Sequence, residues 1–90
     1  MIIVAGTIRC RPGTRDEFVQ GSLEAVEAAR AHPECLDFAV SGDPVEPDRV
    51  NIFEMWTSLA ALTAFREEGP AEDLSSRILE AAVRQYEVAS

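Results

Sequence analysis

The strand-like segment RVNIFEMW, in residues 49–57, constrains the fold of this chain most because it is apolar on both faces. Alternate residues of a β-strand point to opposite sides of a sheet. Apolar residues therefore occupy both sides, with Val50, Ile52 and Trp56 on one and Phe53 and Met55 on the other. Such a strand needs cover on both of its faces.

The first half of the chain predicts a strand, a helix and a second strand. The β-branched run IIVAGTIRC predicts a strand over residues 2–10. Thr14 and Glu17 form a capping box that starts a helix ending near Ala31. Its apolar side carries Val19, Leu23, Val26 and Ala29. The alternating run CLDFAVS predicts a strand over residues 35–41, with Leu36, Phe38 and Val40 on one face.

The second half adds a helix and a closing strand. Thr57 or Ser58 can cap a helix, which the pair Gly69-Pro70 ends. Its apolar stripe consists of Leu59, Leu62 and Phe65. After a short helical turn, AVRQYEVA predicts a last strand over residues 82–89.

These elements follow the order β-α-β-β-α-β, which is the ferredoxin-like arrangement of an α+β domain. The sequence predicts a single domain over residues 1–90 with an antiparallel sheet. Both helices lie on one side of such a sheet, so its other side stays bare. Because the central strand is apolar on both faces, we expect a second copy of the chain to pack on the open side.

The charge of the chain limits its partners. Sixteen acidic residues against eight basic ones give a formal net charge of −8 in 90 residues, which disfavours nucleic acid. No apolar run approaches the length of a membrane span, and the first ten residues lack a basic region before their apolar stretch. We expect a cytoplasmic protein that does not bind a membrane.

The residues that could hold a metal are few. Cys10 and Cys35 do not form a CxxC pair, and His32 is the only histidine. Together they supply at most three of the four ligands that a structural zinc site requires. We expect free thiols and no metal site.

Candidate functional residues gather around Glu54 and Trp56, which share one face of their strand. A carboxylate beside Ile52 and Trp56 either has a raised pKa and acts as a base, or pairs with an arginine such as Arg9 or Arg84. Trp56 fills the core or forms a wall for a flat substrate. Phe65 would line the helix side. Tyr86 would direct its hydroxyl into the same cavity or into water.

Several segments in order carry a family resemblance: the turn RPGT, the strand PECLDFAV, the loop DPVEPDR, the strand NIFEMW and the helix SLAALTAF. The most specific feature is Glu54-Met55-Trp56, followed by a helix that begins at Ser58. The chain resembles the antibiotic biosynthesis monooxygenase domain family along essentially its whole length.

The resemblance implies a homodimer with a dimeric α+β barrel, a cavity between sheet and helices in each subunit, and Trp56 at or near that cavity. Members include oxygenases that convert aromatic polyketides to quinones without metal or flavin, haem-degrading enzymes and isomerases, so the fold does not decide the function. Many relatives carry a histidine in the helix after the tryptophan, where this chain has Ala64-Phe65-Arg66.

The leading hypothesis is a cofactor-independent monooxygenase that oxidises a small aromatic phenol or hydroquinone to a quinone with dioxygen. Glu54 would accept the proton beside Trp56, and Ile52, Phe65 and Tyr86 would contact the substrate. The alternative is a homodimer that binds a small ligand without catalysis. Haem binding or degradation requires an axial ligand, for which His32 is poorly placed.

Overall fold

The computed structural model, which describes residues 1–69 and 74–89, is an α+β fold with a four-stranded antiparallel sheet. The strands are β1 (Ile2–Cys10), β2 (Cys35–Gly42), β3 (Arg49–Trp56) and β4 (Ile78–Glu87), in the spatial order β2-β3-β1-β4. The helices are α1 (Arg15–Gly21), α2 (Leu23–Ala31) and α3 (Leu59–Glu67), and a 3-10 turn, η1, spans Ser75–Arg77. The predicted ferredoxin-like arrangement is confirmed. In this part of the chain, no helix is long and apolar enough to cross a membrane.

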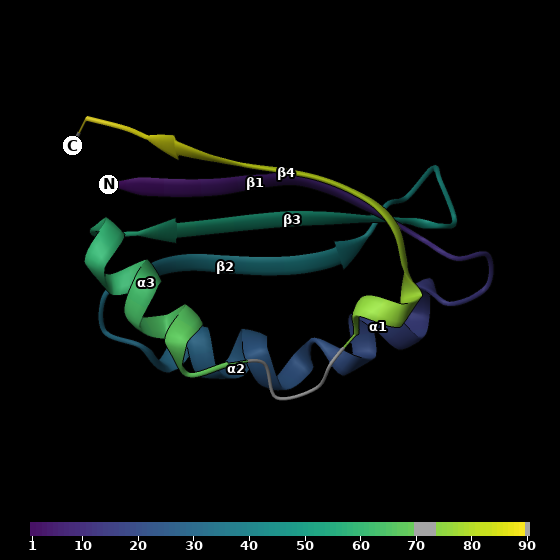
Figure 1. Cartoon of the computed structure of the whole chain (residues 1–90), viewed down its shortest axis with the longest axis horizontal. Coiled ribbons are helices and arrows are strands. Elements are labelled where there is room, and N and C mark those ends of the chain that lie inside the picture. The colour runs from purple at the N-terminus through teal and green to yellow at the C-terminus, as the bar shows by residue number, and fades with distance from the viewer. Residues whose placement is uncertain (70–73, 90) are drawn as a thin grey trace.

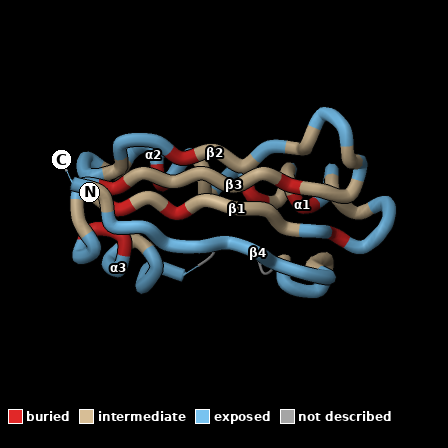
Figure 2. The backbone as a smooth tube through the Cα atoms, turned by 90° about the horizontal axis from the view of Figure 1, so that it is seen from above, coloured by how far each residue is buried: buried red, intermediate tan, exposed pale blue. Residues whose placement is uncertain are grey.

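The helices all lie on one side of the sheet and leave the other side bare (Figure 1). Seen from the bare side, β2, β3 and β1 run side by side, and β4 follows the edge with almost all of its residues exposed (Figure 2). The first strand of the chain therefore lies inside the sheet, between β3 and β4.

The predicted first helix is divided into α1 and α2 at Ser22. The buried hydroxyl of Ser22 donates to the carbonyl of Phe18 at 2.8 Å, and a side chain that bonds to the preceding turn in this way bends a helix. Leu23, which opens α2, is exposed at 48%, so its predicted place in the core is wrong. Phe18 is buried instead.

The predicted capping box at Thr14 is also wrong. The Thr14 hydroxyl donates to the carbonyl of Arg11 at 2.8 Å and makes no cap hydrogen bond to the helix. Glu17 turns outward, where its carboxylate accepts from Arg77 at 3.0 Å. By contrast, the Ser58 hydroxyl caps α3 as predicted, because it accepts from the backbone N–H of Ala61 at 3.2 Å.

Two strands differ from their predicted form. Leu36 is exposed at 53% because a β-bulge between Cys35 and Asp37 shifts the alternation, although Phe38 is buried as predicted. β4 begins at Ile78 and is longer than predicted, since its pairing with β1 extends to Cys10. The predicted helical turn before it is limited to η1 among the described residues, and the part of that prediction at residues 71–73 lies outside them.

Buried side chains form two clusters between sheet and helices. The larger one combines residues from both layers, namely Ile2, Val4, Ala29, Phe38, Trp56, Ala61 and Leu62. The smaller one consists of Cys10, Phe18 and Val50 near the other end of the sheet. Val40 packs against both clusters. The register places Gly6, which has no side chain, opposite Ile52 between them.

The opposite face of the sheet is bare and partly apolar. In the ladders of β1 with β3 and β4, Ile3 lies between Met55 and Tyr86, and Ala5 has Phe53 as a neighbour. These positions alternate with the buried residues of the same strands, so their side chains point away from the helices. Apart from the exposed Tyr86 at the edge, they are half-buried.

Gly6 allows β4 to approach β1 closely, which yields a prediction about stability. A Cβ atom at Gly6 would meet the backbone of Ala82 and Val83, whereas a Cβ at Gly13 would meet nothing within 4 Å. We expect Gly6→Ala to lower the free energy of unfolding by about 3 kcal/mol, because atoms forced into filled space cost this much.

Gly13→Ala is the matched control, and its φ of 79° should make it cost only about 1 kcal/mol. Urea unfolding followed by circular dichroism measures both variants. Equal losses would contradict the close approach of β4 as the cause.

Candidate functional site

Glu54 and Trp56 lie next to each other on the side of β3 that faces the helices. The indole Nε1–H of Trp56 donates a hydrogen bond to Oε1 of Glu54 at 3.1 Å. Glu54 is central in the sheet, because its neighbours are Val4 on β1 and Phe38 on β2. The sequence-based expectation that the two side chains share one face is confirmed.

The surroundings of Glu54 disfavour its charged form. Burial raises the pKa of this carboxyl above its ordinary value of 4.5. The hydrogen bond from Trp56 and the positive charge of Arg66 act in the opposite direction but do not cancel the effect of burial. A carboxylate with a raised pKa accepts a proton more readily than an ordinary one.

Trp56 is fully buried and stands at the centre of an aromatic cluster. Its ring centroid lies 5.0 Å from that of Phe65 of α3, in a tilted arrangement. Phe38 and His32 meet it edge to face, at 6.5 Å and 5.6 Å between centroids. Within one chain, Trp56 is therefore a core residue, and it reaches the surface only through its neighbours.

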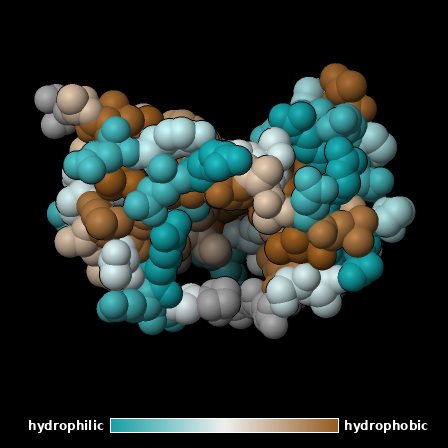
Figure 3. Space-filling view, turned by 45° about the horizontal axis from the view of Figure 1, so that its top comes forward, coloured by the Kyte–Doolittle hydropathy of each residue, from teal (hydrophilic) through white to brown (hydrophobic). Residues whose placement is uncertain are grey.

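A cleft of about 500 Å³ opens between α2 and the end of α3. Its volume is within the range of small-molecule sites. The described residues that line it are Glu24, Ala25, Ala28, Phe65, Arg66, Glu68 and Gly69. The space-filling view shows a hollow near the middle of the molecule, with hydrophobic side chains in brown on its walls (Figure 3).

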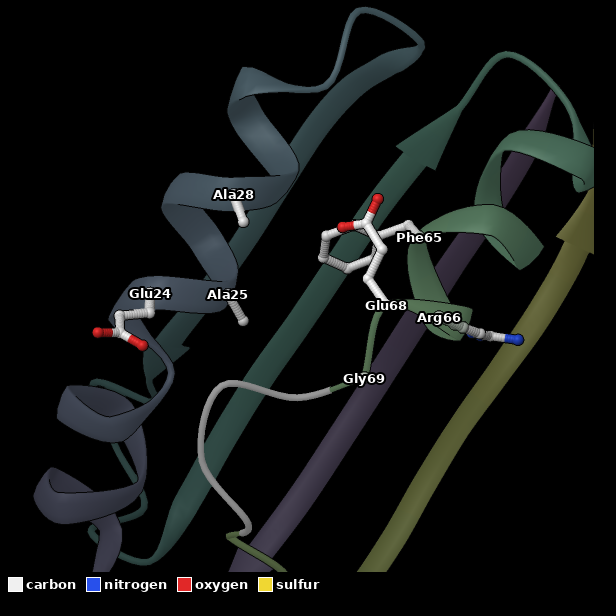
Figure 4. Close-up of a pocket in the computed structure, with 7 residues that line it drawn as sticks. All are labelled: Glu24, Ala25, Ala28, Phe65, Arg66, Glu68 and Gly69. Carbon is white, nitrogen blue, oxygen red and sulfur yellow. The ribbon is translucent and has the colours of Figure 1, made fainter.

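The close-up shows how these side chains are directed (Figure 4). Phe65 and Glu68 project from the end of α3 on the side that faces α2, and Ala25 and Ala28 face them across the gap. Arg66 points away toward β4, where its Nη1 donates to Oε1 of Gln85 at 3.5 Å. The two alanines leave the space that a larger side chain would fill.

Phe65 joins the cleft to the carboxylate. It lines the cleft and contacts Trp56, and Trp56 donates to Glu54. Glu54 itself is not among the residues that line the cleft. The site consists of an apolar cleft at the surface, an aromatic pair behind it and a proton-accepting group behind the pair.

The remaining residues predicted to contact substrate are not brought to this cleft. Ile52 shares the face of Glu54 but packs against the cluster of Cys10, Phe18 and Val50. Tyr86 is opposite Ile3 in the ladder, on the bare face of the sheet, and is exposed at 49%. In a single chain, Tyr86 and Trp56 therefore lie on opposite faces.

The predicted pairing of Glu54 with Arg9 or Arg84 is wrong for the same geometric reason. Both arginines occupy positions of β1 and β4 that point to the bare face. Arg9 instead approaches Glu46, with 3.9 Å between Nη2 and Oε2. The cation that acts on Glu54 is Arg66, from the helix side.

Sequence reasoning missed several residues of the site. In the sequence, Arg66 is only part of the segment where many relatives carry a histidine, and its effect on Glu54 depends on where α3 docks. Ala25 and Ala28 have no chemical signature, although a pair of small residues three positions apart on one helix face is a signal for a close approach or a gap. Glu68 ends α3 as its C-cap, a position that the sequence assigns only to helix termination.

Both thiols are free, as expected, and lie at strand ends. Burial is the main cause that raises the pKa of Cys10 and of Cys35, which disfavours the thiolate form of both. In residues 1–69 and 74–89, no group of three or more His, Cys, Asp or Glu side chains could hold a metal ion.

Comparison with known sequences identifies a family. The family described as antibiotic biosynthesis monooxygenase matches residues 1–75. A curated relative, the uncharacterized protein sll1783 of Synechocystis, is 34% identical over 61 residues. That match covers 68% of this chain but only 42% of the relative, so the chain spans less than half of its length.

Solved structures share the fold at low sequence identity. A protein from Nitrosomonas europaea matches with a TM-score of 0.85 at 14% identity, covering 100% of both chains. Rv0793 from Mycobacterium tuberculosis matches with a TM-score of 0.83 at 16% sequence identity, and the match covers 99% of this chain and 95% of Rv0793. A structure named antibiotic biosynthesis monooxygenase matches with a TM-score of 0.78 at 20% sequence identity, and the match covers 100% of both chains.

The raised pKa of Glu54 predicts a pH-dependent loss of stability. Because the folded state favours the protonated carboxyl, its contribution is fully present below the unfolded pKa, near 4.5, and is lost as the pH rises through the higher folded pKa. In Glu54→Gln, which keeps a neutral side chain, this loss should be absent. Urea unfolding of both proteins between pH 4 and pH 8, followed by Trp56 fluorescence, measures it. An identical pH dependence in the two proteins would contradict the prediction.

Proposed function

The chain belongs to the antibiotic biosynthesis monooxygenase family, and we propose that it is a monooxygenase that oxidises a small aromatic phenol or hydroquinone to a quinone with dioxygen and no cofactor. The observation that carries the proposal is the connected series of the cleft, Phe65, Trp56 and the desolvated Glu54. A flat substrate fits a cleft that has an aromatic ring on one wall and two alanines on the other.

In the proposed reaction, Glu54 removes the phenolic proton with Oε2, the oxygen that is not bonded to Trp56. The electron-rich ring carbon of the anion then bonds to one atom of dioxygen, and the proton returns to the peroxide. The hydroperoxide loses water and leaves a carbonyl group. One oxygen atom enters the quinone and the other enters water, so a phenol needs no further reductant. Apolar surroundings favour this chemistry, because they exclude competing water.

For Glu54 to reach the substrate, the rings of Phe65 and Trp56 must both shift, because Phe65 lies between the cleft and Trp56, and Trp56 lies between Phe65 and Glu54. Phe65 is only partly buried, and it belongs to the last turns of α3. Rotation of such a side chain is fast compared with turnover. Movement of both rings is therefore part of the proposal.

A homodimer that binds a small ligand without catalysis is the second candidate function. The observation that favours it is the complete burial of Trp56, which makes its ring a core element of the single chain. This candidate uses the same cleft and differs from the first in the absence of oxygen consumption. One experiment can therefore separate the two.

We expect Glu54→Gln to abolish turnover and to preserve binding. A positioned general base contributes roughly 10²- to 10⁴-fold to the rate. An oxygen electrode measures uptake with a panel of naphthols and hydroquinones, and calorimetry measures binding of the same compounds. The variant should lose oxygen uptake by about this factor, with a dissociation constant within about twofold of the wild type.

Ala28→Phe fills the cleft and should weaken binding by about tenfold or more. Ala31→Phe is the matched control, because it makes the same change on the same helix outside the residues that line the cleft. Ligand binding without oxygen uptake by the wild type would support the non-catalytic function. Unchanged ligand binding by Ala28→Phe would contradict the cleft between α2 and α3 as the binding site.

We also propose that a second copy of the chain covers the bare face of the sheet. Ile3, Ala5, Phe53 and Met55 form an apolar area there, and such an area on a small domain is typical of an interface. Phe53 is central in it, since Ala5 and Ala39 flank it on the neighbouring strands.

Phe53→Arg should convert a dimer into a monomer, because the dimer would bury two unpaired charges. Light scattering coupled to size exclusion measures the molar mass. Val45→Arg, at a loop position that is exposed at 85%, makes the same change away from this face and should leave the dimer intact. A wild-type chain that is monomeric at all concentrations would contradict the proposal.

A further inference from the structure

The charged residues around the cleft are arranged unevenly. Of the described residues that line it, Glu24, Arg66 and Glu68 are charged. Arg66 points toward β4 and bonds to Gln85, and Glu24 extends away from the gap (Figure 4). Glu68 projects on the same side as Phe65, toward α2. The charge that a bound ligand meets beside the aromatic wall is therefore negative.

The whole chain strengthens this effect. Its formal net charge is −8, so the field around the cleft repels anions before they reach it. An uncharged phenol is not repelled, and its hydroxyl can donate a hydrogen bond to a carboxylate. A cationic aromatic ligand is attracted by the same group. An aromatic carboxylate offers no donor and adds a second negative charge.

We propose that the cleft between α2 and α3 selects aromatic ligands by charge, accepting uncharged and cationic rings and rejecting aromatic carboxylates, and that Glu68 determines this specificity. The inference rests on the proposed function in one respect, since it places the ligand in the same cleft. It goes further because it defines which aromatic compounds can be substrates.

The expected size of the effect follows from Coulomb's law. Two unit charges about 6 Å apart near a protein surface change an affinity by roughly three- to tenfold at low salt. Because Glu68 is exposed, salt should screen a large part of this difference. Glu67, the neighbouring carboxylate, is not among the residues that line the cleft and provides a matched control with the same change in net charge.

The test uses the full chain at pH 7 and low salt with three ligands that share one ring system: 2-naphthol, 2-naphthoate and 2-naphthylmethylamine, which is cationic at this pH. Calorimetry measures their dissociation constants. The wild type should bind naphthoate roughly tenfold more weakly than naphthol or worse. Glu68→Gln should reduce that ratio by roughly three- to tenfold, and Glu67→Gln by less than about twofold. A salt concentration of 0.5 M should reduce the wild-type ratio as well.

The results distinguish a failure of selection by charge from a failure of the proposed function. Equal affinity for naphthoate and naphthol, or equal effects of the Glu67 and Glu68 variants, would overturn selection by charge and leave the proposed function standing. Failure of all three ligands to bind would overturn both. Circular dichroism of the variants confirms that the fold is unchanged, which is expected because both carboxylates are exposed.

Discussion

The packing of α3 against the buried indole of Trp56 fixes where this helix docks on the sheet, and the other parts of the site depend on that position. Ala61 and Leu62 of α3 belong to the same buried cluster as Trp56, and Phe65 packs against it. Truncation of a buried aromatic side chain costs a domain about 4 kcal/mol, which is a large share of the stability of a chain this small. With α3 in place, Arg66 acts on Glu54 and Glu68 reaches the cleft. This packing thus sets the electrostatics of the site as well as its shape.

The carboxyl group of Glu54 opposes the stability that this packing provides. An isoleucine or leucine at its position would extend the apolar surface that Trp56 begins, whereas the carboxyl must give up water when the chain folds. The hydrogen bond from Trp56 offsets part of that cost. Local rules of stability are broken most often where a protein has a function, and the half-buried Glu54 beside Trp56 is such a break.

The sequence predicted the features that depend on short periodic patterns. The shared face of Glu54 and Trp56 follows from the alternation of a strand, and the inward position of Phe65 follows from helical spacing. The face of Tyr86 could not be predicted, because β4 lacks a clear apolar side and its register is set by pairing with β1. The β-bulge beside Leu36 could not be predicted either, because it appears only in the pairing of β2 with β3. The cleft depends on how α2 and α3 are placed relative to each other, and the alanines that line it do not indicate that placement in the sequence.

The position of β1 between β3 and β4 has a consequence for the synthesis of the chain. Of the four strands, β1 leaves the ribosome before the others, yet the strand that covers its outer edge is the last of the four. Until β4 emerges, the run IIVAGTI presents open backbone groups beside β-branched side chains, which is the pattern that invites wrong pairing between chains. Premature truncation within β4 would therefore turn this molecule from a folded domain into a template for aggregation.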